Sequence, residues 1–447
     1  MSVYDLILKN GTCVSFNKNK NSVVREQASI GITNGKIVAT EIFSHDTAKQ
    51  IIDLAGLTLL PGVIDSQVHF REPGLTHKED LESGTRSALL GGVTSVIEMP
   101  NTMPPTTTKE LFQQKLDLAK NRAHCHYGFF IGGAADNAEQ LAALEQHPNC
   151  SGVKIFLGSS FGNLLVDDDA VFERILQSGK RRVIIHSEDE KRLKERKNIA
   201  VESAHPRVHH IWRDEESAMI STRKSIHMAR KHQRPAHILH VSSSDEMAIL
   251  SENKDIVSVE ILPQFLVLSA PECYERLGTL AQQNPPIRDV RHLEKLWAAV
   301  NSGVVDVIGS DHAPHTLEEK NKPYPQSPSG VPGVQTLIPI MLNEVNKGKM
   351  RLEKFVELVT ENPRRLFNCK NKGRIEVGFD ADFTVIDLKR EQIIEKKWLA
   401  SKVGWSPFEG QKVKGWPVMA ILKGEIAMRD EKIVRPNTGE AVEFDVH

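Results

Sequence analysis

Side chains of metal-binding type stand at or near the ends of short apolar runs in this chain. Val183–Ile185, for example, leads into His186, and Ile238-Leu239 leads into His240. Imidazoles and a carboxylate that meet in space supply the ligands that a divalent metal ion requires. The full set of candidate ligands is His69, Lys154, His186, His240 and Asp311.

The apolar runs predict the elements that would bring these side chains together. Runs of about four to eight residues that each end in a polar residue are typical of buried parallel strands. In a closed α/β barrel, the carboxyl ends of such strands meet on one face, where catalytic residues lie. We therefore expect an α/β fold in which a barrel carries the candidate ligands on that face.

Lys154 is the unusual member of the set, because it stands inside the apolar run Gly152–Phe156. A lysine at this place points into the predicted barrel, where an unpaired ammonium group is costly. We therefore disfavour the alternative that Lys154 merely ends its strand in solvent. A lone histidine after an apolar run is more often structural, and His237 is interpreted in that way.

The chain is too long for a single hydrophobic core, with 447 residues. Between residues 61 and 369, strands alternate with helical stretches such as Ser217–His232 and Leu293–Asn301, which predicts the barrel. Both chain ends instead show short strands with turn signals. We predict that residues 1–60 and 370–447 pair into one small β-sandwich.

Two local signals refine this division. Asn34-Gly35 lies between alternating apolar positions, a strong hairpin signal. Thr316–Pro332 is rich in Pro, Ser and Lys and is the best candidate for a mobile loop over the barrel mouth.

Composition excludes several classes of partner. The formal net charge is −1, so nothing indicates binding to nucleic acid or to an anionic membrane. The five cysteines form no CxxC pair, which favours a reduced, cytoplasmic protein. No signal peptide is evident, and no apolar stretch approaches the roughly 20 residues of a membrane span.

Several motifs carry a family resemblance when they are taken together and in order. They cover nearly the whole chain, and they are Pro61–Gly74, Met99–Thr102, Asn284–Arg288, Asp311–His315 and Asn371–Gly378. In this combination the sequence resembles dihydroorotase of the amidohydrolase superfamily. The resemblance implies a (β/α)8 TIM barrel of the metal-dependent hydrolase type and a small-molecule substrate.

The chemistry implied by the resemblance is reversible hydrolysis of a cyclic amide. L-dihydroorotate and water give N-carbamoyl-L-aspartate, and ring closure serves pyrimidine synthesis. A metal such as Zn²⁺ lowers the pKa of its bound water towards about 7 and polarises the carbonyl. By resemblance, Lys154 is carboxylated and bridges two metals, and Asp311 is both a metal ligand and the general acid and base.

The resemblance also implies residues that bind the substrate. Dihydroorotate carries a ring carboxylate, which a guanidinium group recognises through two hydrogen bonds. Arg71 would supply that group, although alone it could be an ordinary surface arginine beside a turn. The full set of implied contacts is Arg71, Asn101, Asn284, His315, Ser329 and Gly330.

This chain departs from the family pattern at two positions. Gln67 stands where the family usually has the first His of a His-x-His pair, and Gln264 stands where relatives often have His. A Gln oxygen is a weak ligand compared with imidazole. We therefore expect one Zn²⁺ to bind tightly at Lys154, His186 and His240, and a second to bind weakly or not at all.

Other functions stay open at this point. Dihydropyrimidinase, hydantoinase and allantoinase also open cyclic amides, but their substrates lack the ring carboxylate. A catalytically silent homologue kept as a partner of aspartate transcarbamoylase is another reading. The retained candidate ligands favour an active enzyme, and a homo-oligomer, either dimer or tetramer, is expected.

Overall fold

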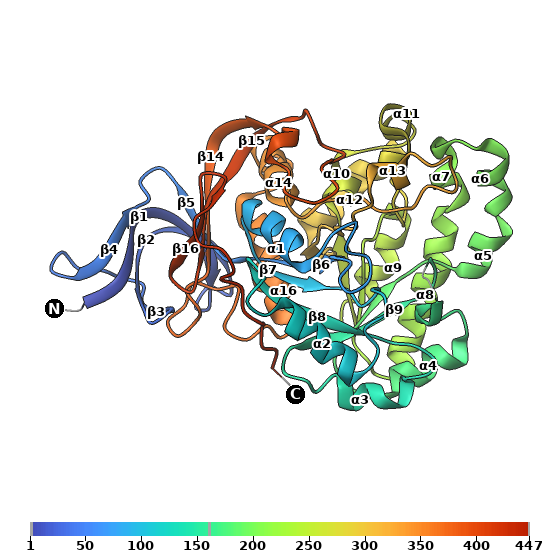
Figure 1. The fold of residues 1–447 in the computed structure, drawn as a ribbon, viewed down its shortest axis with the longest axis horizontal. Coiled ribbons are helices and arrows are strands. Elements are labelled where there is room, and N and C mark those ends of the chain that lie inside the picture. The colour runs from blue at the N-terminus through green and yellow to red at the C-terminus, as the bar shows by residue number, and fades with distance from the viewer. Residues whose placement is uncertain (1–2, 160–161, 446–447) are drawn as a thin grey trace.

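The computed structural model describes residues 3–159 and 162–445. It has two parts, a barrel surrounded by helices and a β-sheet module that lies against one side of it (Figure 1). The N-terminus lies at the far edge of the sheet module. Helices α5, α6 and α7 lie at the opposite edge of the barrel.

Eight parallel strands form the barrel, and each pairs with its neighbour in chain order. Beyond the last strand, Val68 pairs in parallel with His312, which joins the two ends of the sheet. This arrangement confirms the predicted barrel. The strands are β6 (Val63–Val68), β7 (Val93–Glu98), β8 (His126–Gly132), β9 (Cys150–Phe156), β10 (Val183–His186), β11 (Ala236–Ile238), β12 (Val257–Ile261) and β13 (Val307–Ile308).

Helices follow the strands along the chain, as the βα alternation predicted. The two helical stretches singled out in the sequence are α8 and α12, and the Asp214 side chain caps α8 by accepting from the Ser217 amide. The helices are α1 (Leu81–Leu90), α2 (Lys109–Ala119), α3 (Leu141–Leu144), α4 (Asp169–Gln177), α5 (Glu190–Glu195), α6 (Lys197–Ser203), α7 (His209–Trp212), α8 (Glu215–Lys231), α9 (Met247–Glu252), α10 (Pro263–Val267), α11 (Glu272–Leu277), α12 (Leu293–Ser302), α13 (Leu317–Lys320), α14 (Leu337–Asn346), α15 (Leu352–Val359) and α16 (Glu361–Leu366).

The two chain ends meet in one sheet of nine strands with its own apolar core. Strand β5 joins them, because it pairs with β1 from the N-terminal end and β14 from the C-terminal end. Pairing of the two chain ends, which the predicted small β-sandwich requires, is therefore confirmed. Its strands are β1 (Val3–Asn17), β2 (Ser22–Thr33), β3 (Lys36–Ala39), β4 (Thr47–Asp53), β5 (Thr58–Pro61), β14 (Phe383–Ile393), β15 (Lys412–Leu422), β16 (Glu425–Arg429) and β17 (Lys432–Ile433).

Local signals in this module are explained by backbone geometry. Asn34 and Gly35 both have positive φ, 51° and 72°, as the tight turn between β2 and β3 requires. After β17, the described residues up to 445 leave the sheet and run along the barrel, where Ala441 pairs with Tyr127. The predicted domain boundaries between the sheet module and the barrel, at residues 60/61 and 369/370, stay a prediction.

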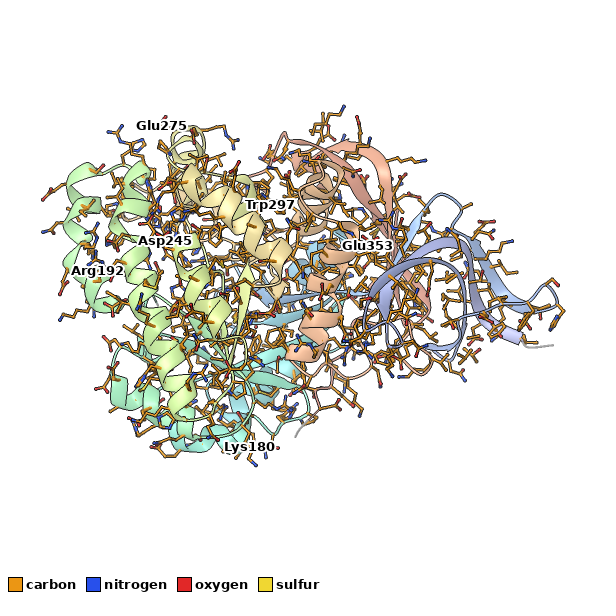
Figure 2. The ribbon with its side chains drawn as sticks, turned by 180° about the vertical axis from the view of Figure 1, so that it is seen from behind. Lys180, Arg192, Asp245, Glu275, Trp297 and Glu353 are labelled. Carbon is orange, nitrogen blue, oxygen red and sulfur yellow. The ribbon has the colours of Figure 1, made fainter. Side chains whose placement is uncertain are left out.

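The module and the barrel also contact each other through side chains. Glu353 of α15 pairs with Arg25 of β2 at 3.3 Å, and Figure 2 shows Glu353 where the barrel meets the sheet. All five cysteines are buried and unpaired. Among the residues that the structure describes, no helix is both long enough and apolar enough to cross a bilayer.

Candidate active site

A cavity of about 600 Å³ opens at the carboxyl ends of the barrel strands. Residues from the barrel strands, from α5–α7 and from the segment after α13 line it. The structure brings every predicted site residue to this cavity, together with Gln67. These residues are Gln67, His69, Arg71, Asn101, Lys154, His186, His240, Asn284, Asp311, His315, Ser329 and Gly330.

The candidate metal ligands approach one another in two close pairs. His186 Nδ1 lies 3.0 Å from His240 Nε2, and His69 Nε2 lies 3.1 Å from Asp311 Oδ1. Burial lowers the pKa of all three imidazoles. Neutral imidazoles keep a lone pair, and a lone pair is what a metal ion binds.

Lys154 lies on β9 and its side chain is fully buried. Its Nζ has no hydrogen-bond partner within the described part of the chain. Burial lowers the pKa of Lys154 to about 7, although the charges of Asp311 and Glu260 oppose this shift. A neutral amine is nucleophilic, so this lysine has the chemistry needed to react with carbon dioxide.

The backbone is strained at several residues of the cavity, three of which are predicted site residues. Arg71, His240 and Asp311 have φ values of 66°, 39° and 46°, in the left-handed region that side chains larger than glycine rarely adopt. Such strain concentrates at functional sites, where the surrounding structure enforces it. It directs a guanidinium group, an imidazole and a carboxylate into one space.

Gln67 takes a definite place among the ligands. Its Nε2 donates to Asp311 Oδ1 at 3.0 Å, while its Oε1 is buried without a hydrogen-bond partner among the described residues. Gln67 therefore holds the Asp311 carboxylate and leaves one amide oxygen unsatisfied. Neutral imidazoles, a carboxylate, an unpaired amine and this free oxygen together fit a divalent cation.

A second group of metal-binding type lies outside the cavity. Glu215, Asp289 and His292 bring one ligand-type atom each within 4.8 Å of one another. Arg291 pairs with both carboxylates, and both ring nitrogens of His292 are engaged, by Ser244 and by Glu215. We interpret this group as an ion-pair cluster.

Glu188 and Arg213 support His186 and were missed in the sequence. Glu188 Oε2 lies 2.8 Å from His186 Nε2, and the Arg213 guanidinium group pairs with Glu188. A carboxylate on one ring nitrogen fixes the tautomer and frees the other nitrogen for a ligand bond. A glutamate two residues after a candidate ligand is a signal that could have been used.

Asn101 supports His69 in a similar way. Asn101 Oδ1 lies 2.7 Å from His69 Nδ1 and can only accept, so Nδ1 carries the proton. The lone pair of Nε2 is then free to face Asp311. Asn101 was predicted to contact the substrate, and its amide nitrogen keeps the capacity to donate to it.

A cationic corner lies on the other side of the cavity. Arg71 Nη2 lies 3.3 Å from His315 Nε2, and Lys78 Nζ lies 3.2 Å from His315 Nδ1. Lys78 also pairs with Glu319 at 3.0 Å, so it is charged and can only donate to Nδ1. Arg71 is also only a donor, so a neutral His315, which has one lone pair, can accept from only one of these two cations.

This corner suits an anion. Burial together with the charges of Arg71, Lys78 and Lys320 lowers the pKa of His315 well below its usual range. A carboxylate placed between Arg71 and His315 would accept from both and relieve the repulsion between the two donors. Lys78 was missed in the sequence, because its partner lies 237 residues away.

The predicted loop Thr316–Pro332 lies at the cavity mouth. The buried Lys320 side chain anchors this loop, because its Nζ donates to the carbonyls of Gln282, Pro328 and Gly330 at 2.9–3.1 Å. Ser329 and Gly330 line the cavity. Whether the loop moves stays a prediction.

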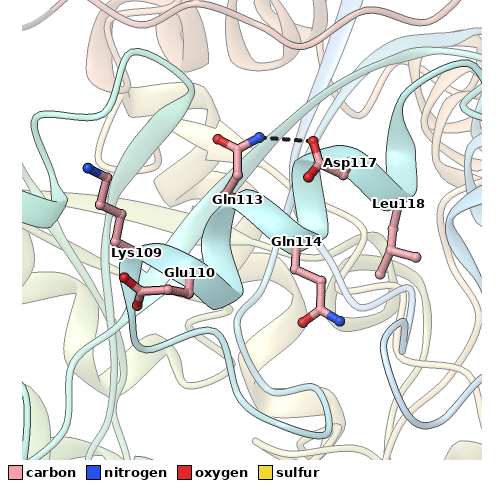
Figure 3. A pocket seen from close by; sticks show the side chains of 6 residues that line it. All are labelled: Lys109, Glu110, Gln113, Gln114, Asp117 and Leu118. Carbon is pink, nitrogen blue, oxygen red and sulfur yellow. Dashed lines mark hydrogen bonds between the residues drawn. The ribbon is translucent and has the colours of Figure 1, made fainter.

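Two predicted positions and one other hollow lie outside the site. Gln264 donates to the Ser310 carbonyl at 3.1 Å and does not line the cavity. His237 lies 2.7 Å from the Ser258 hydroxyl within the barrel. A separate hollow over α2, shown in Figure 3, is lined by polar surface residues such as Lys109 and Asp117 and contains none of the predicted site residues.

Comparison with known proteins places this site in a family context. Residues 58–427 match the Amidohydrolase family. Dihydroorotase of Methanosarcina acetivorans is 34% identical over 431 residues, which cover 93% of this chain and 92% of that protein. Dihydroorotase of Pyrococcus abyssi is 34% identical over 417 residues, covering 93% of this chain and 94% of that protein.

Solved structures with the same fold include a hydantoinase and a dihydropyrimidinase. L-hydantoinase (dihydropyrimidinase) from Arthrobacter aurescens aligns with a TM-score of 0.93 at 26% identity, covering 98% of this chain and all of that one. Dihydropyrimidinase from Brevibacillus agri aligns with a TM-score of 0.89 at 26% identity, covering 99% of both chains.

Proposed function

Because this chain belongs to the amidohydrolase family, we propose that it is a dihydroorotase, which interconverts N-carbamoyl-L-aspartate and L-dihydroorotate. It is a hydrolase of cyclic amides that acts on a small molecule. The observation that carries the more specific proposal is the cationic corner, in which Arg71 and Lys78 contact His315, and which shares one cavity with the candidate metal ligands.

Members of this family depend on metal ions, and we propose Zn²⁺ for this chain. His69, Lys154, His186, His240 and Asp311 would hold it, with Lys154 carboxylated on Nζ. When bound, the metal polarises the amide carbonyl and lowers the pKa of the attacking water. With Gln67 in place of an imidazole, we propose one tight site at Lys154, His186 and His240 and a second, weaker site.

The residues of the chain then handle the protons. In ring opening, water adds to the amide carbonyl and gives a proton to Asp311. The ring C–N bond breaks as Asp311 passes that proton to the leaving nitrogen. Gln67 holds Asp311 Oδ1 through its amide N–H and so fixes the direction of the carboxylate. Ring closure is the same sequence reversed.

Substrate selection rests on the other half of the cavity. We propose that Arg71 and His315 bind the ring carboxylate, that Asn101 adds a donor, and that Asn284 faces the ring. Ser329 and Gly330 hold the ring edge. The structural relatives are named hydantoinase and dihydropyrimidinase, and the substrates of such enzymes lack this ring carboxylate. A ring without the carboxylate would leave Arg71 and His315 without an anionic partner.

The pH dependence of the equilibrium tests this assignment. Closure of N-carbamoyl-L-aspartate consumes one proton. Lowering the pH by one unit should therefore raise the equilibrium ratio of L-dihydroorotate to N-carbamoyl-L-aspartate about tenfold. We expect the metal-replete protein to make dihydroorotate at mildly acidic pH and to open it at alkaline pH, measured by absorbance and chromatography. Metal-replete protein that catalyses neither direction contradicts the proposal.

The assembly and the location are also proposed. We propose a homo-oligomer, either dimer or tetramer, located in the cytoplasm, with aspartate transcarbamoylase as the candidate protein partner. Light scattering of the purified chain, alone and after mixing with aspartate transcarbamoylase, tests both associations.

A further inference from the structure

His209 lies behind the cavity wall, fully buried between three parts of the chain. Its Nε2 lies 3.1 Å from the Gln283 carbonyl oxygen and 3.0 Å from Asn284 Oδ1. Its Nδ1 lies 3.1 Å from the hydroxyl of Tyr324. His209 therefore touches Asn284, which lines the cavity, while being outside the cavity itself.

The proton on His209 is placed by the Gln283 carbonyl. A carbonyl oxygen can only accept, so Nε2 must carry the hydrogen. Burial and the nearby charge of Arg213 lower the pKa of His209 to about 3. The ring is therefore neutral, and Nδ1 accepts from the Tyr324 hydroxyl.

This tautomer determines which way the Asn284 amide points. Because Nε2 of His209 donates, the Asn284 atom 3.0 Å away must be an acceptor, which is the amide oxygen. The amide nitrogen is left without a protein partner among the described residues. Asn284 thus offers N–H donors, and not a carbonyl, to whatever occupies the cavity.

We propose that His209 is a positioning residue that fixes the Asn284 amide so that its N–H donors face a carbonyl oxygen of a cyclic ureide. This inference rests on the proposed function and adds a determinant of specificity to it. The donor would reject a ring that presents an N–H group at that place, because two donors would face each other.

A double-mutant cycle tests the coupling between the two residues. In steady-state kinetics with L-dihydroorotate, His209→Leu should raise KM about three- to tenfold and change kcat little, as expected for lost ground-state binding. Asn284→Ala should raise KM by at least as much. The double variant should then match Asn284→Ala, because His209 acts only through Asn284. Additive effects overturn the proposal.

Two further variants separate positioning from packing. His209→Gln keeps an N–H donor and should recover most of the loss. His210→Leu is the matched control, since His210 stacks on Tyr274 and makes no hydrogen bond to Asn284 within the described part of the chain. If it raises KM as much as His209→Leu does, with a similar fall in Tm, the role of His209 is only structural.

Asn284→Asp tests the donor assignment even if His209→Leu does not fold. The new carboxylate can accept from His209 but presents oxygen to the ring, so KM should rise more than in Asn284→Ala. Binding equal to that of the wild type overturns the inference. Wild-type protein inactive with dihydroorotate contradicts the proposed function instead, and the cycle is then measured on the cyclic amide it opens. Protein that opens none overturns both.

Discussion

Asp311 lies between two side chains of different kinds, His69 and Gln67, and both contact its Oδ1 atom. An imidazole can give up a lone pair to a metal, whereas the amide of Gln67 uses its N–H group to hold the carboxylate. The amide oxygen of Gln67 is left buried and without a protein partner among the described residues. Gln67 therefore positions the Asp311 carboxylate, and its free amide oxygen can contact a metal only as a weaker ligand than an imidazole.

Gln67→His should raise the metal content. A second imidazole at this position supplies a stronger ligand, so the metal-to-protein ratio should move from about one towards about two. Plasma mass spectrometry of metal-saturated, desalted protein measures the ratio. Lys154→Ala should abolish activity in both backgrounds. Two metals already bound tightly in the wild type would mean that Gln67 or water is an adequate ligand.

Arg71→Met should weaken binding of a ring carboxylate. The lost charge-assisted contact corresponds to roughly 1.5 to 3 kcal/mol, so KM for dihydroorotate should rise by an order of magnitude or more. Metal content should stay unchanged. The matched control is Arg230→Met, because Arg230 pairs with Asp255 on the exposed surface. Unchanged KM for Arg71→Met would place the carboxylate elsewhere.

At the scale of elements, the loop after α13 depends on one buried lysine. The three carbonyls that Lys320 holds come from the segment before Asn284 and from the cavity-lining residues 328–330. The loop is thereby tied to another part of the cavity wall. The three hydrogen bonds that the Lys320 ammonium group makes within the described part of the chain all go to backbone carbonyls, and none goes to a carboxylate.

Lys320→Met should disturb this loop more than the barrel. Three carbonyls lose their donor, so KM should rise about tenfold, while Tm should fall by only a few degrees. Lys322→Met is the control, since Lys322 is an exposed residue of the same loop. Equal kinetics for the two variants would show that Lys320 does not order the substrate contacts.

The barrel could be predicted from the sequence because a barrel strand produces a local signal, a short apolar run that ends in a polar residue. Val183–Ile185 is apolar and His186 ends it, and the structure has β10 over Val183–His186. The supporting residues could not be found in this way. His209 and Asn284 are 75 residues apart, and Lys78 and His315 are 237 residues apart, so no local pattern connects them. Only the closed barrel brings such pairs into contact.

The C-terminal tail, which is residues 434–445 of the described chain, crosses from the sheet module to the barrel. Val442 donates its amide to the Tyr127 carbonyl at 2.7 Å, and Phe444 is buried among barrel residues. The sequence placed residues 370–447 in the sheet module, because a short tail carries no periodic pattern that reveals its partner. Residues Val442 and Phe444 of the tail therefore contribute to the apolar packing of the barrel.

Phe444→Ala should therefore destabilise the barrel. Removing this buried ring should lower the free energy of unfolding by about 3–5 kcal/mol, while kcat at low temperature stays near that of the wild type. Urea unfolding followed by fluorescence measures the change. Val434→Ala is the control, with Val434 57% exposed. A loss below about 1 kcal/mol for Phe444→Ala would show that the tail is not part of the barrel core.

The proposed substrate and metal dependence are tested together by comparing ring opening of L-dihydroorotate, dihydrouracil and hydantoin by the metal-replete protein, before and after chelation. We expect L-dihydroorotate to be opened with a kcat/KM about 100-fold or more above that of dihydrouracil or hydantoin, because only L-dihydroorotate has a carboxylate to pair with Arg71 and His315. Chelation should remove the activity and Zn²⁺ should restore it. Opening of dihydrouracil or hydantoin without opening of dihydroorotate would contradict the proposed dihydroorotase activity.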